Sequence, residues 1–155
     1  MKEDFSLEYV HEFFSQFLVR KNMRKTSERF AVLDYVNNYK GHFDAEMLFN
    51  DMQQTYRVSL ATIYNTIELL ISCGLVVKHP FGGHTARYEK TFGKQSHQHL
   101  ICLKCGSVKE FSDKKLKVTL KHKTFPKFET THYALYVYGV CSKCGIAKGS
   151  KKDII

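Results

Sequence analysis

The feature that most constrains this 155-residue chain is a pair of Cys-x-x-Cys motifs. Cys102 and Cys105 form the first pair, and Cys141 and Cys144 form the second. Two intervening residues let both thiolates of a pair face one ion at about 2.3 Å. Two such pairs make a tetrahedral sulfur set that suits Zn(II) and leaves no open position for chemistry. We therefore expect a structural zinc ion that joins the two ends of a subdomain containing residues 106–140.

The alternative is two disulfides, or thiols without a role. Disulfides need an oxidising compartment, and the start Met1-Lys-Glu-Asp, followed by an amphipathic segment, is not a signal peptide. No apolar stretch reaches the roughly 20 residues that span a bilayer. With 43% hydrophobic residues and two prolines, the sequence predicts a folded, soluble protein. The absence of a targeting segment and the unpaired fifth cysteine fit a cytoplasmic location.

The formal net charge of +9 favours an anionic partner, but the charge is unevenly distributed. Residues 1–90 carry 11 basic and 11 acidic side chains, whereas residues 91–155 carry 13 and 4. The basic excess therefore lies entirely in the second part of the chain. Its lysines are either a solvated surface or a means of steering DNA, and the sequence leaves both open.

Four amphipathic helices are expected in the first part, at residues 6–19, 26–39, 44–53 and 59–72, each opened by a capping residue. In the first, Leu7 is expected to face the core. In the fourth, Leu60, Ile63, Ile67, Leu70 and Ile71 are expected to face the core, and Thr62, Tyr64, Asn65 and Thr66 to face outward. Strands at 75–79 and 85–90, joined by the tip 81–84, then form a hairpin. This order predicts a winged helix-turn-helix domain over residues 1–90, preceded by one additional helix.

The second part has a mixed pattern that predicts a small α/β dimerisation domain over residues 97–146. Strands are expected at 99–103, 108–111 and 131–140, with a helix at 113–123. Residues 91–96 are polar and form a natural hinge, and 147–155 are expected to be a flexible basic tail. The fold class is therefore α+β.

In a winged helix-turn-helix, the N-terminal residues of the recognition helix contact base edges in the major groove. Thr62, Tyr64 and Asn65 lie in the right turn of the fourth helix, and Asn can bond adenine in bidentate fashion. Five basic residues in and after the link between the first two helices are candidates for contacts to phosphates or to a narrow minor groove: Arg20, Lys21, Arg24, Lys25 and Arg29. A winged helix that binds a protein partner is the alternative. Because one such domain covers one half-site, we expect a dimer.

A second metal site of a different kind is suggested by His42, Glu89, His97, His99 and Glu110. His97 and His99 share one side of an extended segment because side chains alternate along a strand. Three imidazoles and two carboxylates suit Fe(II), Mn(II), Co(II) or Zn(II) and lack the thiolates that would select zinc. Taken singly, each residue is more often a surface polar group. A metalloenzyme is a further alternative, although five protein ligands leave little room for a substrate.

These motifs occur together in a known order. Ala61-Thr-Ile-Tyr-Asn, Gly82-Gly83, Tyr88-Glu89, the stretch from His97 to Gly106, Glu110-Phe111 and Tyr138-Gly-Val-Cys141 occur in register. The chain resembles the ferric uptake regulator (Fur) family over about residues 5–146. The resemblance implies a homodimeric, metal-dependent bacterial repressor that binds double-stranded operator DNA, A/T-rich and palindromic. It implies that the histidine and glutamate residues above form the regulatory site and that the four cysteines hold the structural zinc.

The sequence departs from the family at a further metal site that several members carry. Ser96, Gln98, Lys117 and Tyr133 stand where its ligands would be, and His132 is one position out of register. We therefore expect no third site.

Other positions bear on the signal. Asn65 stands where some iron-sensing members have Arg, so no half-site preference follows. Peroxide-sensing members use aspartates at the positions of Glu89 and Glu110, so the glutamates favour Fe(II) as the signal. Zinc-sensing members often bring a cysteine to the regulatory site, whereas Cys73 is far along the chain and is interpreted as a buried apolar residue. The hypothesis is that one removable ion ties the two domains across residues 91–96.

Overall fold

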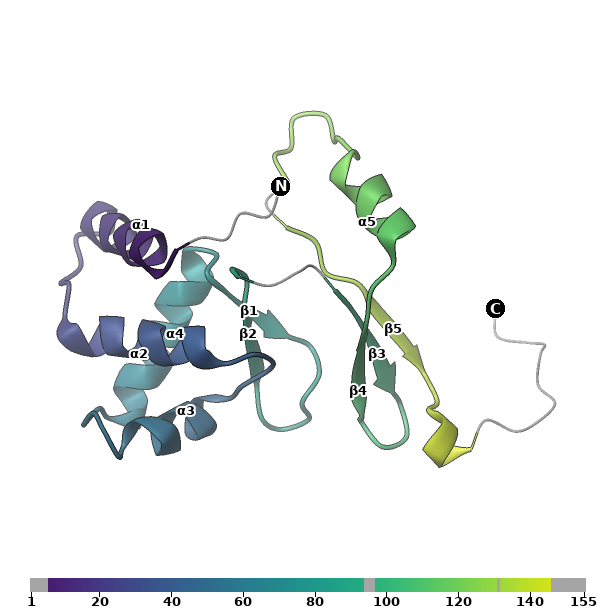
Figure 1. Cartoon of the computed structure of the whole chain (residues 1–155), viewed down its shortest axis with the longest axis horizontal. Helices are drawn as coiled ribbons and strands as arrows, with labels where there is room; N and C mark the ends of the chain where they lie inside the picture. Colours follow the sequence, from purple (N-terminus) through teal and green to yellow (C-terminus); the bar gives the residue numbers. More distant parts are fainter. Residues whose placement is uncertain (1–5, 94–96, 131, 146–155) are drawn as a thin grey trace. The chain divides into compact units, whose positions relative to one another are not determined.

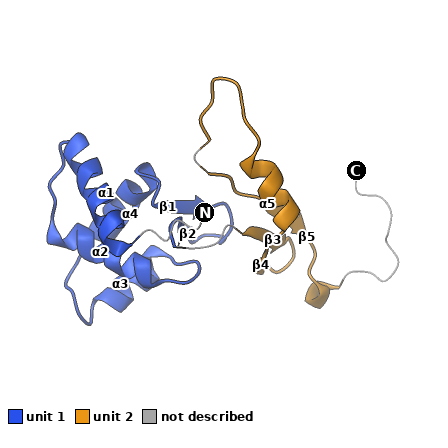
Figure 2. Cartoon of the chain, turned by 45° about the horizontal axis from the view of Figure 1, so that its top comes forward, with its two compact units in different colours: residues 1–94 blue, residues 95–155 orange. Residues whose placement is uncertain are grey.

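The computed structural model describes residues 6–93, 97–130 and 132–145. The chain divides into two compact units, unit 1 from Met1 to Lys94 and unit 2 from Gln95 to Ile155 (Figure 2). Among the described residues, no helix has the length and apolar character needed to cross a membrane. The functional assignments of 1–90, the hinge and 97–146 stay predictions. Residues 94–96 of the expected hinge and the expected tail, 147–155, lie outside the described residues.

The described part of unit 1 contains four helices: α1 (Leu7–Arg20), α2 (Ser27–Asn38), α3 (Ala45–Met52) and α4 (Leu60–Ser72) (Figure 1). Each begins after a residue whose side-chain oxygen accepts the backbone N–H three positions further on. These capping residues are Ser6, Thr26, Asp44 and Ser59. A cap of this kind satisfies a donor that the helix itself leaves without a partner. The four helix starts expected from the sequence are confirmed.

The core of unit 1 is built from aromatic and aliphatic side chains of all four helices. Fully buried members include Phe14, Leu18, Leu33, Leu48, Ile63 and Leu70. Two expected orientations were wrong. Leu7 is 42% exposed, because it lies in the first turn of α1, beyond the core. Thr66 is buried rather than outward-facing, and its Oγ1–H donates to the Thr62 carbonyl at 2.8 Å, which makes burial of the hydroxyl tolerable.

A hairpin follows α4 and pairs β1 (Val76–His79) with β2 (Arg87–Lys90) in antiparallel fashion. At its tip, Gly82 has φ +119°, a conformation that side chains disfavour. A Cβ at this position would lie 2.4 Å from the Thr85 carbonyl oxygen. The tip therefore requires glycine at position 82, which explains one residue of the Gly-Gly pair seen in the sequence.

The segment before α3 is attached to this hairpin by an isolated bridge between Phe43 and Tyr88. The Phe43 N–H donates to Tyr88 O at 2.9 Å, and the Tyr88 N–H donates to Phe43 O at 2.8 Å. This bridge places His42 beside Glu89, because each is a chain neighbour of a bridged residue. Two residues 47 positions apart in the sequence thus become neighbours within unit 1.

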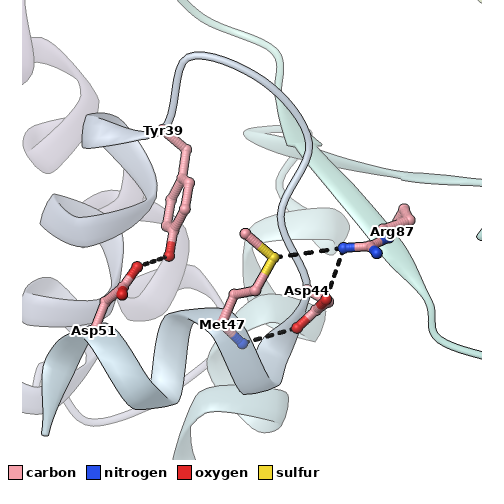
Figure 3. A network of polar contacts seen from close by, with 5 residues as sticks. All are labelled: Tyr39, Asp44, Met47, Asp51 and Arg87. Carbon is pink, nitrogen blue, oxygen red and sulfur yellow. Dashed lines mark hydrogen bonds and ion pairs between the residues drawn. The ribbon is translucent and has the colours of Figure 1, made fainter. Parts of the chain in front are cut away.

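Polar contacts hold α3 against the hairpin and against the end of α2 (Figure 3). Asp44 uses both carboxylate oxygens: Oδ1 accepts the Met47 N–H at 2.8 Å, and Oδ2 accepts from Arg87 Nη1 at 2.7 Å. Tyr39 donates its hydroxyl hydrogen to Asp51. Burial and the Asp51 carboxylate both raise the pKa of Tyr39 above its ordinary value. Asp44 therefore acts both as the cap of α3 and as the ion-pair partner of Arg87 in the β1–β2 hairpin.

Unit 2 contains a three-stranded sheet in the order β4-β3-β5 (Figure 1). Its elements are β3 (Gln98–Cys102), β4 (Val108–Phe111), α5 (Lys114–Lys121), β5 (Tyr136–Gly139) and the short 3-10 helix η1 (Ser142–Cys144). β4 is antiparallel to the central β3, and β5 is parallel to it. The α+β fold expected from the sequence is confirmed.

The last strand is shorter than expected. Pairing is confined to Tyr136–Gly139, while residues 132–135 are not strand and residue 131 lies outside the described residues. The reason is the length of the partner: β3 offers a ladder only from His99, opposite Tyr136, to Cys102, opposite Gly139. The alternation of tyrosine and aliphatic residues predicted a strand, but it contains no information on the limits of the partner strand.

Candidate functional site

The four motif cysteines meet at one end of the sheet of unit 2. Cys102 ends β3, Cys105 lies in the turn toward β4, and Cys141 and Cys144 follow β5. Because β5 runs parallel to β3, with Gly139 opposite Cys102, both motifs leave the sheet at the same end. All four sulfur atoms lie within 4.8 Å of one another.

This cluster has the dimensions of a zinc site. Cys105 Sγ and Cys141 Sγ are 3.7 Å apart. Sulfurs at about 2.3 Å from a tetrahedral zinc ion are separated by about 3.8 Å, whereas a disulfide would bring two of them to about 2.05 Å. All five cysteines of the chain are free thiols. The residues therefore fit the zinc ion expected from the sequence and do not fit the disulfide alternative.

The thiols of this cluster differ strongly in their acidity. Backbone N–H groups of Cys105 and Cys141 lower the pKa of Cys102 to about 6, and Cys141 N lies 3.3 Å from Cys102 Sγ. The Ser107 hydroxyl, 3.2 Å from Cys105 Sγ, lowers the pKa of Cys105. The neighbouring thiols of Cys105 and Cys141 raise the pKa of Cys144 to about 12. Ionisation of all four thiols at this spacing therefore requires a cation.

Unit 1 contributes two of the expected regulatory ligands. His42 Nε2 lies 3.5 Å from Glu89 Oε2, and the Glu89 side chain is only 6% exposed. Ligand atoms at about 2.1 Å from one ion are separated by roughly 3–3.5 Å, so the pair fits a shared ion. The bridge between Phe43 and Tyr88 is what brings the two together.

A third residue at this position was not expected from the sequence. His79 Nε2 lies 2.9 Å from Glu89 Oε2, and both side chains are buried. His79 ends β1, and Glu89 lies two positions along β2 from the residue opposite it, so the two share one face of the hairpin. Strand alternation could have suggested this pair, but only if the hairpin register had been known.

Unit 2 contributes the other three expected ligands. The rings of His97 and His99 have centroids 4.8 Å apart, and His97 Nε2 lies 3.8 Å from Glu110 Oε1. Glu110 lies directly opposite His99 in the antiparallel pairing of β3 and β4. Tyr136 of β5 stacks on His99 with centroids 5.5 Å apart, which fixes that ring.

The structure thus brings the five expected regulatory ligands together in two groups, one in each unit. His42 and Glu89 form the first group, and His97, His99 and Glu110 form the second. Each group offers imidazole nitrogen and carboxylate oxygen, the donors that suit divalent ions such as Fe(II) and Mn(II). That both groups hold one ion stays a prediction.

Two residues outside these sites have contacts of their own. Gln98, which stands at a ligand position of the third site, is fully buried, and its Oε1 accepts the Asp113 N–H at 3.1 Å. Cys73, interpreted from the sequence as a buried apolar residue, is only half-buried; its Sγ lies 3.4 Å from the Leu70 carbonyl oxygen, and burial raises its pKa. The absence of a third site stays a prediction, as do the roles of Lys117, His132 and Tyr133; residue 96 lies outside the described residues.

The expected DNA-reading residues occupy the first turns of α4. Tyr64 is 43% exposed and Asn65 is exposed, while Thr62 is half-buried, with its Oγ1 2.8 Å from Ser59 Oγ. An open groove runs beside them, and its lining includes Arg29, Arg57, Ser59, Thr62 and Asn65. The exposed Arg20, Arg24 and Lys25 lie in and beside the link between α1 and α2. Arg29 donates to the Arg24 carbonyl, which braces that link on α2.

Comparison with known proteins adds independent information. The model of the ferric uptake regulator family matches residues 20–138. The peroxide-responsive repressor PerR of Staphylococcus epidermidis is 29% identical over 129 residues, which cover 82% of this chain and 85% of that protein.

Solved structures of ferric uptake regulators are also similar to this chain. The ferric uptake regulator from Pseudomonas aeruginosa with manganese has a TM-score of 0.66 and 27% identity, covering 82% of this chain and 96% of that one. The Helicobacter pylori regulator Fur has a TM-score of 0.69 and 20% identity, covering 98% of this chain and 100% of that one. The second likeness bears on the fold alone.

Proposed function

This chain belongs to the ferric uptake regulator family, and from that premise we propose that Fe(II) is the signal to which it responds. It is a metal-responsive, DNA-binding transcription regulator, as its relatives are. In the proposal, the metal-loaded homodimer binds operator DNA in the bacterial cytoplasm and represses transcription. When iron is scarce, the regulatory ion leaves and the operator is released.

The observation that supports this proposal is that each unit presents an imidazole and a carboxylate close to the spacing of two ligands of one ion. The distances are 3.5 Å for His42 and Glu89 and 3.8 Å for His97 and Glu110. With His99, these residues supply three nitrogens and two carboxylates, a set that suits Fe(II) and also accepts Mn(II), Co(II) or Zn(II). The ion would supply the charge that holds all five ligands together.

The zinc ion has a separate role in this proposal. Cys102, Cys105, Cys141 and Cys144 would hold it permanently, because four sulfur ligands close the coordination sphere. Unit 2 has a sheet of only three short strands, and a metal staple stabilises a unit of this size. Zinc would thus maintain the dimerisation unit and take no part in sensing.

Coupling between metal and DNA would follow from the position of the ligands on both sides of residues 91–96. An ion bound by both groups would join the two units and fix the spacing of the two recognition helices in the dimer. The ion favours this arrangement of the two units only if it binds this arrangement more tightly than the others. About 5.5 kcal/mol of differential binding would move a 1:99 equilibrium to 99:1.

For DNA, we propose that the first turns of α4 read base edges through Thr62, Tyr64 and Asn65. Arg20, Arg24 and Lys25 would bind phosphates and set the position on the duplex. A homodimer presents two such helices, so the operator is expected to be palindromic, and A/T-rich because Asn and the apolar carbons of Thr and Tyr suit A·T pairs.

The decisive experiment is metal analysis of protein purified with and without mild chelation, paired with operator binding in each state. One zinc per chain should survive chelation, while a second, exchangeable ion should not. Operator binding should fall with loss of the second ion and return on adding Fe(II) without oxygen. His97→Ala should abolish this metal dependence, whereas His84→Ala, at the exposed hairpin tip, should not. Unchanged metal dependence in His97→Ala contradicts the proposal.

Peroxide sensing is the second candidate, because a curated relative is a peroxide-responsive repressor. Against it, Glu89 and Glu110 stand where peroxide-sensing members have aspartates. The two functions differ in what peroxide does to the iron-loaded protein. An iron sensor should keep its regulatory histidines intact at low peroxide, whereas a peroxide sensor should gain one oxygen on a histidine-containing peptide. Mass spectrometry of digested protein separates these outcomes.

A further inference from the structure

His79 is a buried titratable side chain beside His42 and Glu89, the metal group of unit 1, and the proposed function does not use it. Its Nε2 lies 2.9 Å from Glu89 Oε2, at hydrogen-bond distance, whereas His42 Nε2 lies 3.5 Å from the same oxygen. The side chains of His79 and Glu89 are 3% and 6% exposed. A buried carboxylate needs a hydrogen-bond donor, and His79 is placed to supply one.

The direction of this hydrogen bond follows from the chemistry of the pair. An ionised carboxylate has only acceptor oxygens, so the hydrogen between the two atoms must be carried by His79 Nε2. A nitrogen that carries a hydrogen has no lone pair for a metal ion. Nε2 of His79 is therefore suited to orient Glu89 rather than to bind the ion beside it.

The imidazole of His79 is itself held in place by its neighbours. Phe81 stacks on it with centroids 4.8 Å apart and an interplanar angle of 14°. The His42 ring meets it edge-on, with centroids 4.9 Å apart, and also meets Phe81. Phe81 is carried by the hairpin tip, whose shape depends on Gly82. Phe81 of the hairpin tip therefore holds the His79 ring in place, and His79 in turn holds the Glu89 carboxylate.

We propose that His79 is a positioning residue of the regulatory site: its Nε2–H holds the Glu89 carboxylate in the orientation in which Glu89 and His42 bind one ion. This inference rests on the proposed function, because it takes Glu89 as a ligand. Residues that hydrogen-bond to metal ligands restrict their rotamers, and loss of such a residue typically lowers metal affinity about 10–100-fold. His79 would make the sensor carboxylate ready for the ion before the ion arrives.

The test compares three substitutions in the full-length, zinc-containing protein. His79→Leu removes the donor, His79→Gln keeps an N–H donor near the position of Nε2, and His84→Gln is the control at the exposed tip. Co(II) is the probe, with affinity measured by competition against a fluorescent chelator and geometry by visible absorption. Thermal unfolding without Co(II) reports the effect on the fold.

The expected result is a Co(II) affinity about 10–100-fold lower in His79→Leu, while His79→Gln stays with the wild type and the control. The Co(II) spectrum of His79→Gln should match that of the wild type. If His79→Leu does not fold, His79→Asn takes its place, since its shorter amide does not reach Glu89.

Two results would overturn the inference. Wild-type affinity in His79→Leu would mean that Glu89 needs no support, and an equal loss in His79→Gln would mean that His79 is itself a ligand. Glu89→Gln separates this inference from the proposed function. If Glu89→Gln also leaves Co(II) affinity unchanged, the regulatory site itself is wrong; if it lowers the affinity while His79→Leu does not, only the role of His79 is wrong.

Discussion

Single residues separate the two kinds of cysteine in this chain. Cys102→Ser removes one of four sulfur ligands, so we expect loss of the tightly held zinc and a lower thermal stability of unit 2, because metal binding and folding are coupled in small metal-stapled units. Cys73→Ser is the matched control, since Cys73 lies outside the cluster. Elemental analysis measures the zinc content per chain of both variants, and thermal unfolding measures their stability. A zinc-free but equally stable Cys102→Ser would contradict a structural role.

The unequal acidity of the cysteine thiols predicts a pH dependence in the zinc-free, reduced protein. Cys102 has its pKa lowered from 9.0 to about 6, so its ionisation stabilises the fold fully above pH 9, and this stability is lost as pH falls toward 6. Cys144 has its pKa raised to about 12. Its contribution to the stability of the fold is therefore present below pH 9 and is lost as pH rises from 9 toward 12.

Between pH 6 and 9, therefore, Cys102→Ser should reduce the gain in unfolding free energy that the wild type shows as pH rises. Chemical denaturation at several pH values measures this gain, and Cys73→Ser again serves as control. An equal slope in the wild type and Cys102→Ser would mean that the backbone N–H groups of Cys105 and Cys141 do not favour the thiolate.

The residue scale also shows what local sequence contains and what it lacks. The spacing of the cysteines sufficed to predict their cluster, because two residues between ligands fix most of the geometry. The partnership of His79 with Glu89 could not be predicted in this way. It depends on the register of a hairpin, and a shift of one residue would send His79 to the opposite face.

Among the elements, α3 depends on a residue with two tasks. Asp44 caps the helix through Oδ1 and pairs with Arg87 of β2 through Oδ2 (Figure 3). Asp44→Asn should keep most of the cap and lose the charge of the pair, whereas Asp44→Ala should lose both. We expect Asp44→Ala to lower the unfolding free energy by about 1–2 kcal/mol, and Asp44→Asn by less.

Denaturant titrations of both variants and of Arg87→Met measure these differences. If Asp44→Asn is as unstable as Asp44→Ala, the ion pair with Arg87, rather than the cap, dominates the role of Asp44. The Arg87 side chain is 35% exposed, so solvent screens the pair and the cap is expected to carry the larger part.

Element boundaries were predictable where a local signal exists. Ser6, Thr26, Asp44 and Ser59 each lie directly before a helix, because a capping oxygen acts within three residues. The start of β5 at Tyr136 was not predictable, because it depends on where the neighbouring strand β3 begins to pair, at His99. Local chemistry therefore located the helices, while strands depended on non-local pairing.

The recognition helix provides a second test at this scale. Asn65→Ala should weaken operator binding by about 1–3 kcal/mol and relax discrimination at one base pair, because a bidentate contact is lost. Glu68→Gln is the control, since Glu68 is exposed one turn further along α4. Fluorescence anisotropy with operator and scrambled DNA at fixed salt measures both. Equal weakening on both DNAs would make Asn65 a phosphate contact instead.

At the scale of the whole molecule, charge and metal ligands are distributed differently between the two parts. Residues 91–155 carry the entire net charge of +9, although the predicted base-reading residues belong to unit 1. The sequence alone could suggest a metal site shared by both units, because His42, Glu89, His97, His99 and Glu110 match a family pattern. The structure defines the contacts within each of the two ligand groups. Whether both groups bind the same ion is tested in solution.

A double-mutant cycle on the intact chain supplies that test. His42→Ala in unit 1 and His97→Ala in unit 2 should each lower Mn(II) affinity at least about tenfold, or about 1.4 kcal/mol. If both residues bind one ion, the double variant should lose much less than the sum, with a coupling energy of about 0.5–3 kcal/mol. If each group binds its own ion, the losses should be independent and two exchangeable ions per chain should be found. Calorimetric titration gives affinity and stoichiometry together, and His84→Ala should leave both at their wild-type values. Additive losses with two ions would separate sensing in the two units and remove the basis for coupling metal to DNA across residues 91–96.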